Sequence, residues 1–227
     1  MKKIFLIFFS LLLLIINNII AQKDTVKVED DLLSSLTSDS SNQEKLLPDH
    51  IIFTQRLLWG KKGLMRNFDA FELTPEKRAH ELKIRRTMLV SHQILGSLTS
   101  LGMLAQGIVG TKLYNGDRSI KDLHKGIAAG VNIGYFTTAS LSLFAPPKML
   151  NERKGFSSIK IHKYLAVIHI TSMILTNVLA DQTQNNPKIQ KWHRAAAFTA
   201  FGAFLAAEVV IKFLNKSISN TYKIINR

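Results

Sequence analysis

Four long apolar stretches constrain this chain more than any other feature of its sequence. Their approximate bounds are 87–110, 126–146, 161–180 and 195–211. Each is close to the roughly 20 residues that a helix needs to cross the hydrocarbon core of a bilayer. Charged residues flank the stretches and are almost absent inside them, Glu208 being the main exception. A helix of a soluble bundle would show a polar stripe, so the pattern predicts membrane-spanning helices.

The connections between these stretches are short, so neighbouring helices should be antiparallel. Gly126, Gly130 and Gly134 recur at the spacing that lets membrane helices approach closely. We therefore predict an all-α fold, an integral membrane four-helix bundle over residues 87–214 with a basic tail over 215–227. A signal peptide, a flexible linker and an interfacial amphipathic helix are expected to precede it.

The N-terminal third predicts export. Lys2 and Lys3 precede a long apolar run, and Ala21 offers a cleavage point, so residues 1–21 are expected to form a signal peptide, with an uncleaved anchor as the alternative. Residues 22–50 are rich in Ser, Asp, Glu and Asn and predict a disordered linker. We expect a multi-pass protein of the inner (cytoplasmic) membrane with an exported linker.

The orientation of the spans stays open, because two signals conflict. Lys and Arg are more numerous on the side that holds the start of the first span. The positive-inside rule places that side in the cytoplasm, whereas a cleaved signal peptide places it outside.

Residues 51–86 are expected to form amphipathic and juxtamembrane helices. Over 51–66, apolar side chains and Trp59 are interleaved with Lys and Arg, which predicts an element at the membrane interface. A helix packed on a soluble domain is the alternative. Thr74 is the expected N-cap and Pro75 the first residue of a helix that continues into the first span.

Histidine is the residue type most informative about function. Five of the seven histidines lie in or at the ends of the spans, where polar rings usually mark a cofactor or an ion path. The absence of cysteine excludes thiolate metal sites and c-type haem. The formal net charge of +14 is explained by the flanks of membrane helices, so nucleic-acid binding is not expected.

Antiparallel packing divides these histidines between two ends of the bundle. His92 is expected beside His162 or His169 at one end, and His124 beside His193 at the other. Zinc requires three or four converging ligands, whereas haem iron requires only two axial ligands. The pattern therefore predicts two bis-histidine sites. Small residues one turn inward of the rings should leave room for a macrocycle, namely Gly96, Ala128, Ala166 and Ala197. Cations beside the rings could meet haem propionates, namely Lys125, Lys163 and Arg194.

The segments "SHQILG", "LHKGIAAG", "IHKYLAVIH" and "KWHRAAAF" together resemble the cytochrome b561 family of transmembrane di-haem b electron carriers. The resemblance covers roughly residues 85–212 and implies two haem b groups held by His92 with His162 or His169, and by His124 with His193. It also implies a transmembrane oxidoreductase or electron carrier, whose electron donor and acceptor are not indicated. The family commonly has six spans.

Several alternatives remain open. His162 matches His92 in its distance from the middle of its span, and Ala166 lies beside it, which favours His162 over His169. Glu208 is expected either to act on a ligand histidine or a proton, or to pair with Lys212 at i+4. A membrane assembly or partner-binding subunit without haem is the alternative function, and a transporter using His169 and Glu208 is weaker. The expected partners are haem, membrane lipid, and a second copy or a membrane complex.

Overall fold

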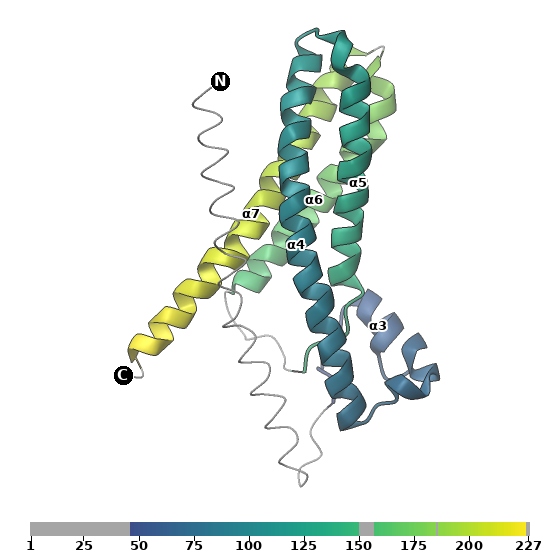
Figure 1. The fold of residues 1–227 in the computed structure, drawn as a ribbon, viewed down its shortest axis with the longest axis vertical. Helices are drawn as coiled ribbons and strands as arrows, with labels where there is room; N and C mark the ends of the chain where they lie inside the picture. Colours follow the sequence, from purple (N-terminus) through teal and green to yellow (C-terminus); the bar gives the residue numbers. More distant parts are fainter. Residues whose placement is uncertain (1–45, 150–156, 185, 226–227) are drawn as a thin grey trace. The chain divides into compact units, whose positions relative to one another are not determined.

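The computed structural model describes residues 46–149, 157–184 and 186–225, with side chains as far as residue 212 (Figure 1). The predicted signal peptide and residues 22–45 of the predicted linker lie outside this range. Within the described part all regular elements are helices and there is no β-strand. The chain divides into an N-terminal unit (residues 1–90 and 142–152) and a helical unit (residues 91–141 and 153–227).

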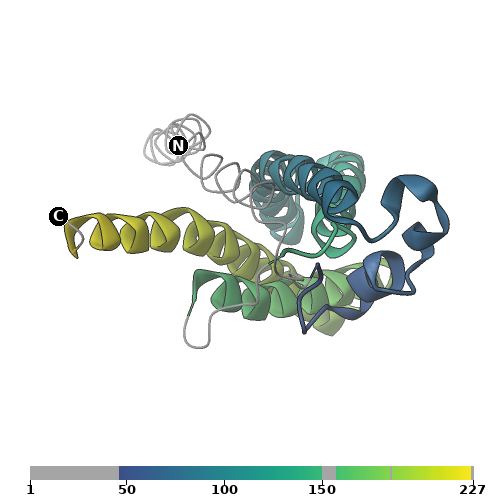
Figure 2. The same ribbon diagram turned by 90° about the horizontal axis from the view of Figure 1, so that it is seen from below.

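The four predicted spans all fall in long helices: α4 (Pro75–Tyr114), α5 (Lys121–Leu143), α6 (Ser158–Ala180) and α7 (Pro187–Ile225). In the helical unit, α4 lies beside α5 and α6 beside α7 (Figures 1 and 2). Short 3-10 turns, η3 (Arg118–Ile120) and η4 (Asp181–Gln184), lie in the α4–α5 and α6–α7 connections. All four helices contribute buried side chains to one core, namely Met103, Val131, Tyr135, Met173, Ala200 and Phe204.

Three of these helices are long and apolar enough to cross a membrane, namely α4, α6 and α7. The helix α5 has 23 residues, which is sufficient length, but Asn, Ser, Thr and Gly make it less apolar. Large apolar side chains are exposed on the helical unit, including Ile133 (71%), Tyr164 (73%) and Val167 (66%). Such a surface is unusual for a protein in water and typical of one surrounded by lipid.

The helix ends follow local chemistry. The carbonyl of Thr74 accepts from Arg78 and α4 begins at Pro75, so the prediction of one helix running from Thr74 into the first span is confirmed. The second stretch ends earlier than predicted, at Leu143, because Pro146 and Pro147 cannot continue a helix. The helix α7 continues to Ile225, through most of the predicted basic tail, where the sequence has neither proline nor glycine to end it.

The N-terminal unit contains α3 (Phe53–Trp59) and the 3-10 helices η1 (Leu64–Asn67) and η2 (Asp69–Phe71). Trp59, predicted to lie at the membrane interface, is instead buried at 5% exposure, and its Nε1 donates to the carbonyl of Phe144 at 2.9 Å. The carbonyls that follow a helix lack intrahelical partners, so this one can take an indole N–H. The predicted linker is too long at its C-terminal end, because Leu47 is buried at 5% exposure.

Buried charged side chains join the segments of this unit. The carboxylate of Glu81 is completely buried and pairs with the guanidinium groups of both Arg66 and Arg78. Arg78 also donates to the carbonyls of Leu46 at 3.0 Å and Pro147 at 2.9 Å. These contacts join Leu46, before α3, and Pro147, after α5, to the first turns of α4.

Candidate functional site

Two histidine rings face each other at one end of the helical unit, which we call the A end. His92 on α4 and His162 on α6 have ring centroids 6.3 Å apart, with the ring planes at 80°. The Nδ1 atom of His92 donates to the carbonyl of Thr138 at 2.8 Å, and that of His162 to the carbonyl of Ala207 at 3.0 Å. A carbonyl oxygen can only accept, so in the neutral ring the lone pair is on Nε2 in both histidines. Hydrogen bonds of this kind orient metal-binding histidines.

His169 lies on the same helix as His162 but in a different environment. It is 7% exposed, its ring centroid lies 5.1 Å from that of Phe204, and its Nδ1 lies 2.5 Å from the phenol oxygen of Tyr135. Tyr135 is 1% exposed, and because a buried hydroxyl needs an acceptor, it donates to this nitrogen. The hydrogen of His169 is then on Nε2, which leaves no lone pair for a metal. This arrangement favours His162 as the ligand.

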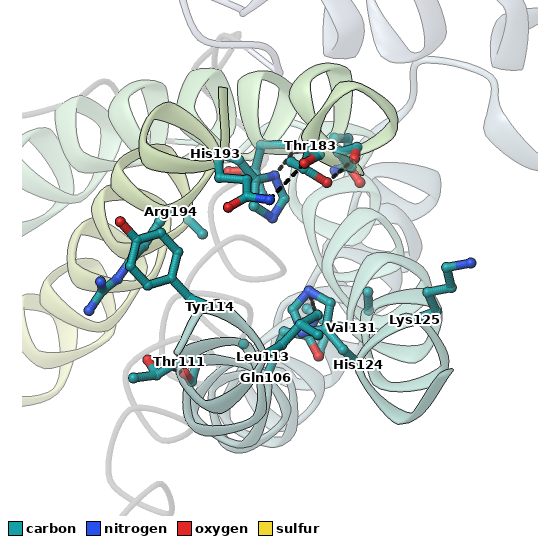
Figure 3. A pocket seen from close by; sticks show the side chains of 18 of the residues that line it. Gln106, Thr111, Leu113, Tyr114, His124, Lys125, Val131, Thr183, His193 and Arg194 are labelled. Carbon is teal, nitrogen blue, oxygen red and sulfur yellow. Dashed lines mark hydrogen bonds between the residues drawn. The ribbon is translucent and has the colours of Figure 1, made fainter. Parts of the chain in front are cut away.

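The opposite end of the helical unit, the B end, contains a cavity of about 380 Å³. His124 on α5 and His193 on α7 stand on opposite walls of this cavity (Figure 3). The small residues Ala128 and Ala197 also line it, as predicted. The Nδ1 atom of His193 donates to the carbonyl of Thr176 at 2.9 Å, so its Nε2 is free. The volume falls in the range of small-ligand pockets.

His124 has no backbone partner for its ring. Its Nε2 accepts from the amide Nε2 of Gln106 on α4 at 3.2 Å, so the lone pair of this ring is engaged by Gln106. Its Nδ1 and the Oε1 of Gln106 are both buried without a hydrogen-bond partner. Buried polar atoms nearly always have a partner, so Nδ1 of His124 and Oε1 of Gln106 are two unsatisfied polar atoms at this end of the helical unit. Gln106 was not among the residues predicted from the sequence, although a lone amide inside an apolar stretch is a signal that could have identified it.

The two cations predicted beside these rings both border the cavity. The guanidinium of Arg194 lies over the ring of Tyr114, 4.5 Å from its centroid, and 5.6 Å from that of Phe198, which are cation–π contacts. Lys125 is exposed and points away from the centre of the cavity (Figure 3). Of these two cations, Arg194 is therefore the one that the structure holds in contact with aromatic rings.

The small residue beside His92 does not leave open space at the A end. A Cβ atom on Gly96 would meet Cγ2 of Thr138 at 3.5 Å and Cζ of Phe204 at 4.0 Å. Thr138 and Phe204 thus fill the space beside Gly96 at ordinary contact distances, which differs from its predicted role of making room for a macrocycle. The hydroxyl of Thr138 is buried without a hydrogen-bond partner, so this end also has an unsatisfied polar atom close to a histidine.

Glu208 on α7 forms the ion pair with Lys212 that was one of its two predicted roles. Its carboxylate pairs with Lys212 at 2.9 Å, accepts from Ser100 on α4 at 2.7 Å, and also accepts from Ser97. Lys212 in turn donates to Ser97 at 3.2 Å. The carboxylate is therefore satisfied by groups that join α7 to α4, as polar groups often join membrane helices.

The number of histidines in each pair equals the number of axial ligands that haem iron takes and is smaller than the number that zinc takes. Among the described residues, no group of three or more His, Cys, Asp and Glu side chains could hold a metal ion, whereas protein zinc sites use three or four such ligands. Haem iron needs two axial ligands. Two imidazole nitrogens at about 2 Å from one metal would place their ring centroids roughly 6 Å apart, and the centroids of His92 and His162 are 6.3 Å apart.

The structure thus brings together the histidines that the sequence paired. His92 lies against His162, while His124 and His193 share one cavity, and His169 is hydrogen-bonded to Tyr135. No protein-family model matches this chain, and neither the curated proteins nor the solved structures contain a significantly similar one.

Proposed function

We propose that this chain is a membrane b-type cytochrome, similar to the cytochrome b561 family, that carries electrons across the bilayer between two bis-histidine haems. The observation that carries the proposal is the arrangement of four histidine rings as two pairs at opposite ends of one helical unit. In three of the four rings, Nδ1 donates to a backbone carbonyl. This supports Nε2 as the metal-binding atom of these three rings. His124 would bind through its Nε2 by exchanging the hydrogen bond from Gln106 for the metal.

The proposed ligands are His92 and His162 at the A end and His124 and His193 at the B end. Haem iron supplies a one-electron redox couple when bound. Each pair of histidines would hold one haem, and iron held by two histidines would offer no position for a substrate. The expected activity is therefore electron transfer, with an electron donor at one end of the helical unit and an acceptor at the other.

The proposal places α4, α5, α6 and α7 as the four spans of an inner-membrane bundle, with an exported N-terminal linker behind a signal peptide. The helix α5 is the least apolar, but its polar groups have partners on α6. Asn132 and Asn177 exchange hydrogen bonds of 3.0 and 2.9 Å, and Tyr135 bonds to His169. Polar groups paired between helices are tolerated within membranes, which supports α5 as the fourth span.

An optical spectrum of the protein purified in detergent from haem-replete cells tests this function. We expect sharp absorption bands in the reduced form, typical of bis-histidine haem b, and haem in excess of one group per chain. The double variant His124→Gln/His193→Gln should lose the B-end haem and keep the A-end haem. A colourless preparation would contradict the proposal and favour a membrane assembly or partner-binding subunit without haem.

Gly110 offers a second test at the B end. A Cβ atom on Gly110 would lie 3.0 Å from Cε1 and 3.3 Å from Nδ1 of His124, so Gly110→Ala should displace this ring and weaken haem binding there several-fold. Gly126→Ala is the matched control, because nothing lies within 4 Å of its added Cβ. Haem titration of the two variants measures the difference. Equal affinities would show that the position of the His124 ring does not govern binding.

A further inference from the structure

The short helix α3 is attached to the last turn of α5. The hydroxyl of Thr54 donates to the carbonyl of Leu143 at 2.7 Å, and the indole of Trp59 donates to the carbonyl of Phe144 at 2.9 Å. The 23 residues of α5 extend over about 34 Å at 1.5 Å per residue, close to the roughly 30 Å of a bilayer's hydrocarbon core. If α5 spans the membrane, as proposed above, its last turn lies at a membrane surface, and so does α3.

One side of α3 is apolar and uncovered. Phe53 is 76% exposed and Leu57 is 51% exposed, and residues four positions apart share one side of a helix. Ile52, just before the helix, is 42% exposed. Phe144, whose carbonyl receives the indole of Trp59, is itself 41% exposed. Exposed apolar side chains are therefore present both on α3 and directly after the last turn of α5.

Positive charge accompanies this apolar side. Arg56 lies within α3, and Lys61 and Lys62 follow directly after it, all three exposed. Neither α3 nor the two residues after its C-cap contain an acidic side chain. Apolar residues combined with Lys and Arg are characteristic of helices that lie in the plane of a membrane surface and favour anionic lipids.

We propose that α3 lies in the headgroup layer of the bilayer, with Phe53 and Leu57 at the boundary of the acyl chains and Lys61 and Lys62 among the phosphates of anionic lipids. The inference rests on the proposed membrane arrangement and adds a lipid-binding surface to it. Trp59, the residue that sequence patterns assign to such a surface, has a different role, because it faces inward and joins α3 to α5.

The chain contains no cysteine, so single cysteines can report on this surface. Phe53→Cys and Leu57→Cys are labelled with a fluorophore in the full-length protein, which is reconstituted in phosphatidylcholine–phosphatidylglycerol vesicles containing lipids with a nitroxide near the headgroup. Glu76→Cys is the control for water. It is exposed and lies 11 residues before the predicted first span, about 16 Å along α4. Val167→Cys, 66% exposed in the middle of α6, is the control for lipid, read with a nitroxide deep in the acyl chains.

We expect the labels at positions 53 and 57 to be quenched several-fold more strongly than the label at position 76. The double variant Lys61→Gln/Lys62→Gln should reduce that quenching when phosphatidylglycerol is present and have little effect in pure phosphatidylcholine. Labels at 53 and 57 that behave like position 76, while position 167 is quenched, would overturn the lipid-binding role of α3 alone. No quenching at position 167 would overturn the membrane arrangement itself.

Discussion

Replacing His162 by glutamine is expected to remove the haem at the A end, which is about half of the haem bound by the chain in the di-haem arrangement. The ring of His162 lies 6.3 Å from that of His92, and its Nδ1 is held by the carbonyl of Ala207. Glutamine offers no comparable nitrogen ligand to iron. Haem per chain, measured after extraction from purified protein, and the amplitude of the reduced absorption bands report the loss.

His169→Gln is the matched control, since it makes the same chemical change seven residues along α6. Because Tyr135 donates to Nδ1 of His169, the lone pair of this ring is already used, and both haems should remain. Some loss of stability is expected, because His169 is 7% exposed and packs against Phe204. Loss of haem in the His169 variant with retention in the His162 variant would reverse the assignment of the ligand.

Glu81→Gln is expected to open the N-terminal unit locally. Glu81 is 0% exposed and neutralises Arg66 and Arg78, which are 9% and 1% exposed. Removing one partner from a buried ion pair typically costs about 3–5 kcal/mol, because a charge is left buried without compensation. Since about 1.4 kcal/mol corresponds to a factor of ten, amide exchange should accelerate by roughly a hundredfold or more. The amides of Arg66, Phe68 and Phe71, which are hydrogen-bonded in this unit, are the reporters.

Glu72→Gln provides the comparison for this effect. Glu72 also pairs with a cation, Lys77, at 2.7 Å, but both side chains are accessible to water. The hydrogen bond and charge of Lys77 lower the pKa of Glu72, yet solvent screens such a pair, and its loss should leave amide exchange unchanged. Similar exchange in the two variants would show that the buried carboxylate of Glu81 is not what stabilises the unit.

The secondary structure was largely predictable because it depends on local patterns. Apolar stretches of membrane-spanning length became α4, α6 and α7, and Thr74 with Pro75 marked the start of α4. The boundary at Leu143 was missed by a few residues, although the two prolines that follow indicate it. The helical C-terminal part of α7 was also missed, since charged and polar residues were taken as the sign of a tail.

The pairing of His92 with His162 or His169, and of His124 with His193, followed from the antiparallel order of the helices. The hydrogen-bond partners of those rings did not follow from that order. A backbone carbonyl is present at every residue, so nothing in the sequence indicates that those of Thr138, Thr176 and Ala207 face histidine rings. Which carbonyl meets which ring depends on the rotation and depth of each helix.

The sequence by itself determined the helical class, the membrane character and the grouping of histidines toward two ends, because each depends on the order and spacing of residues along one chain. Only the tertiary structure decided which way individual side chains face. It turned Trp59 inward toward Phe144, joined Tyr135 to His169, and placed Glu81 between two arginines. The physical reason is that these contacts connect residues far apart in sequence, and their formation depends on burial and on pairing polar groups away from water.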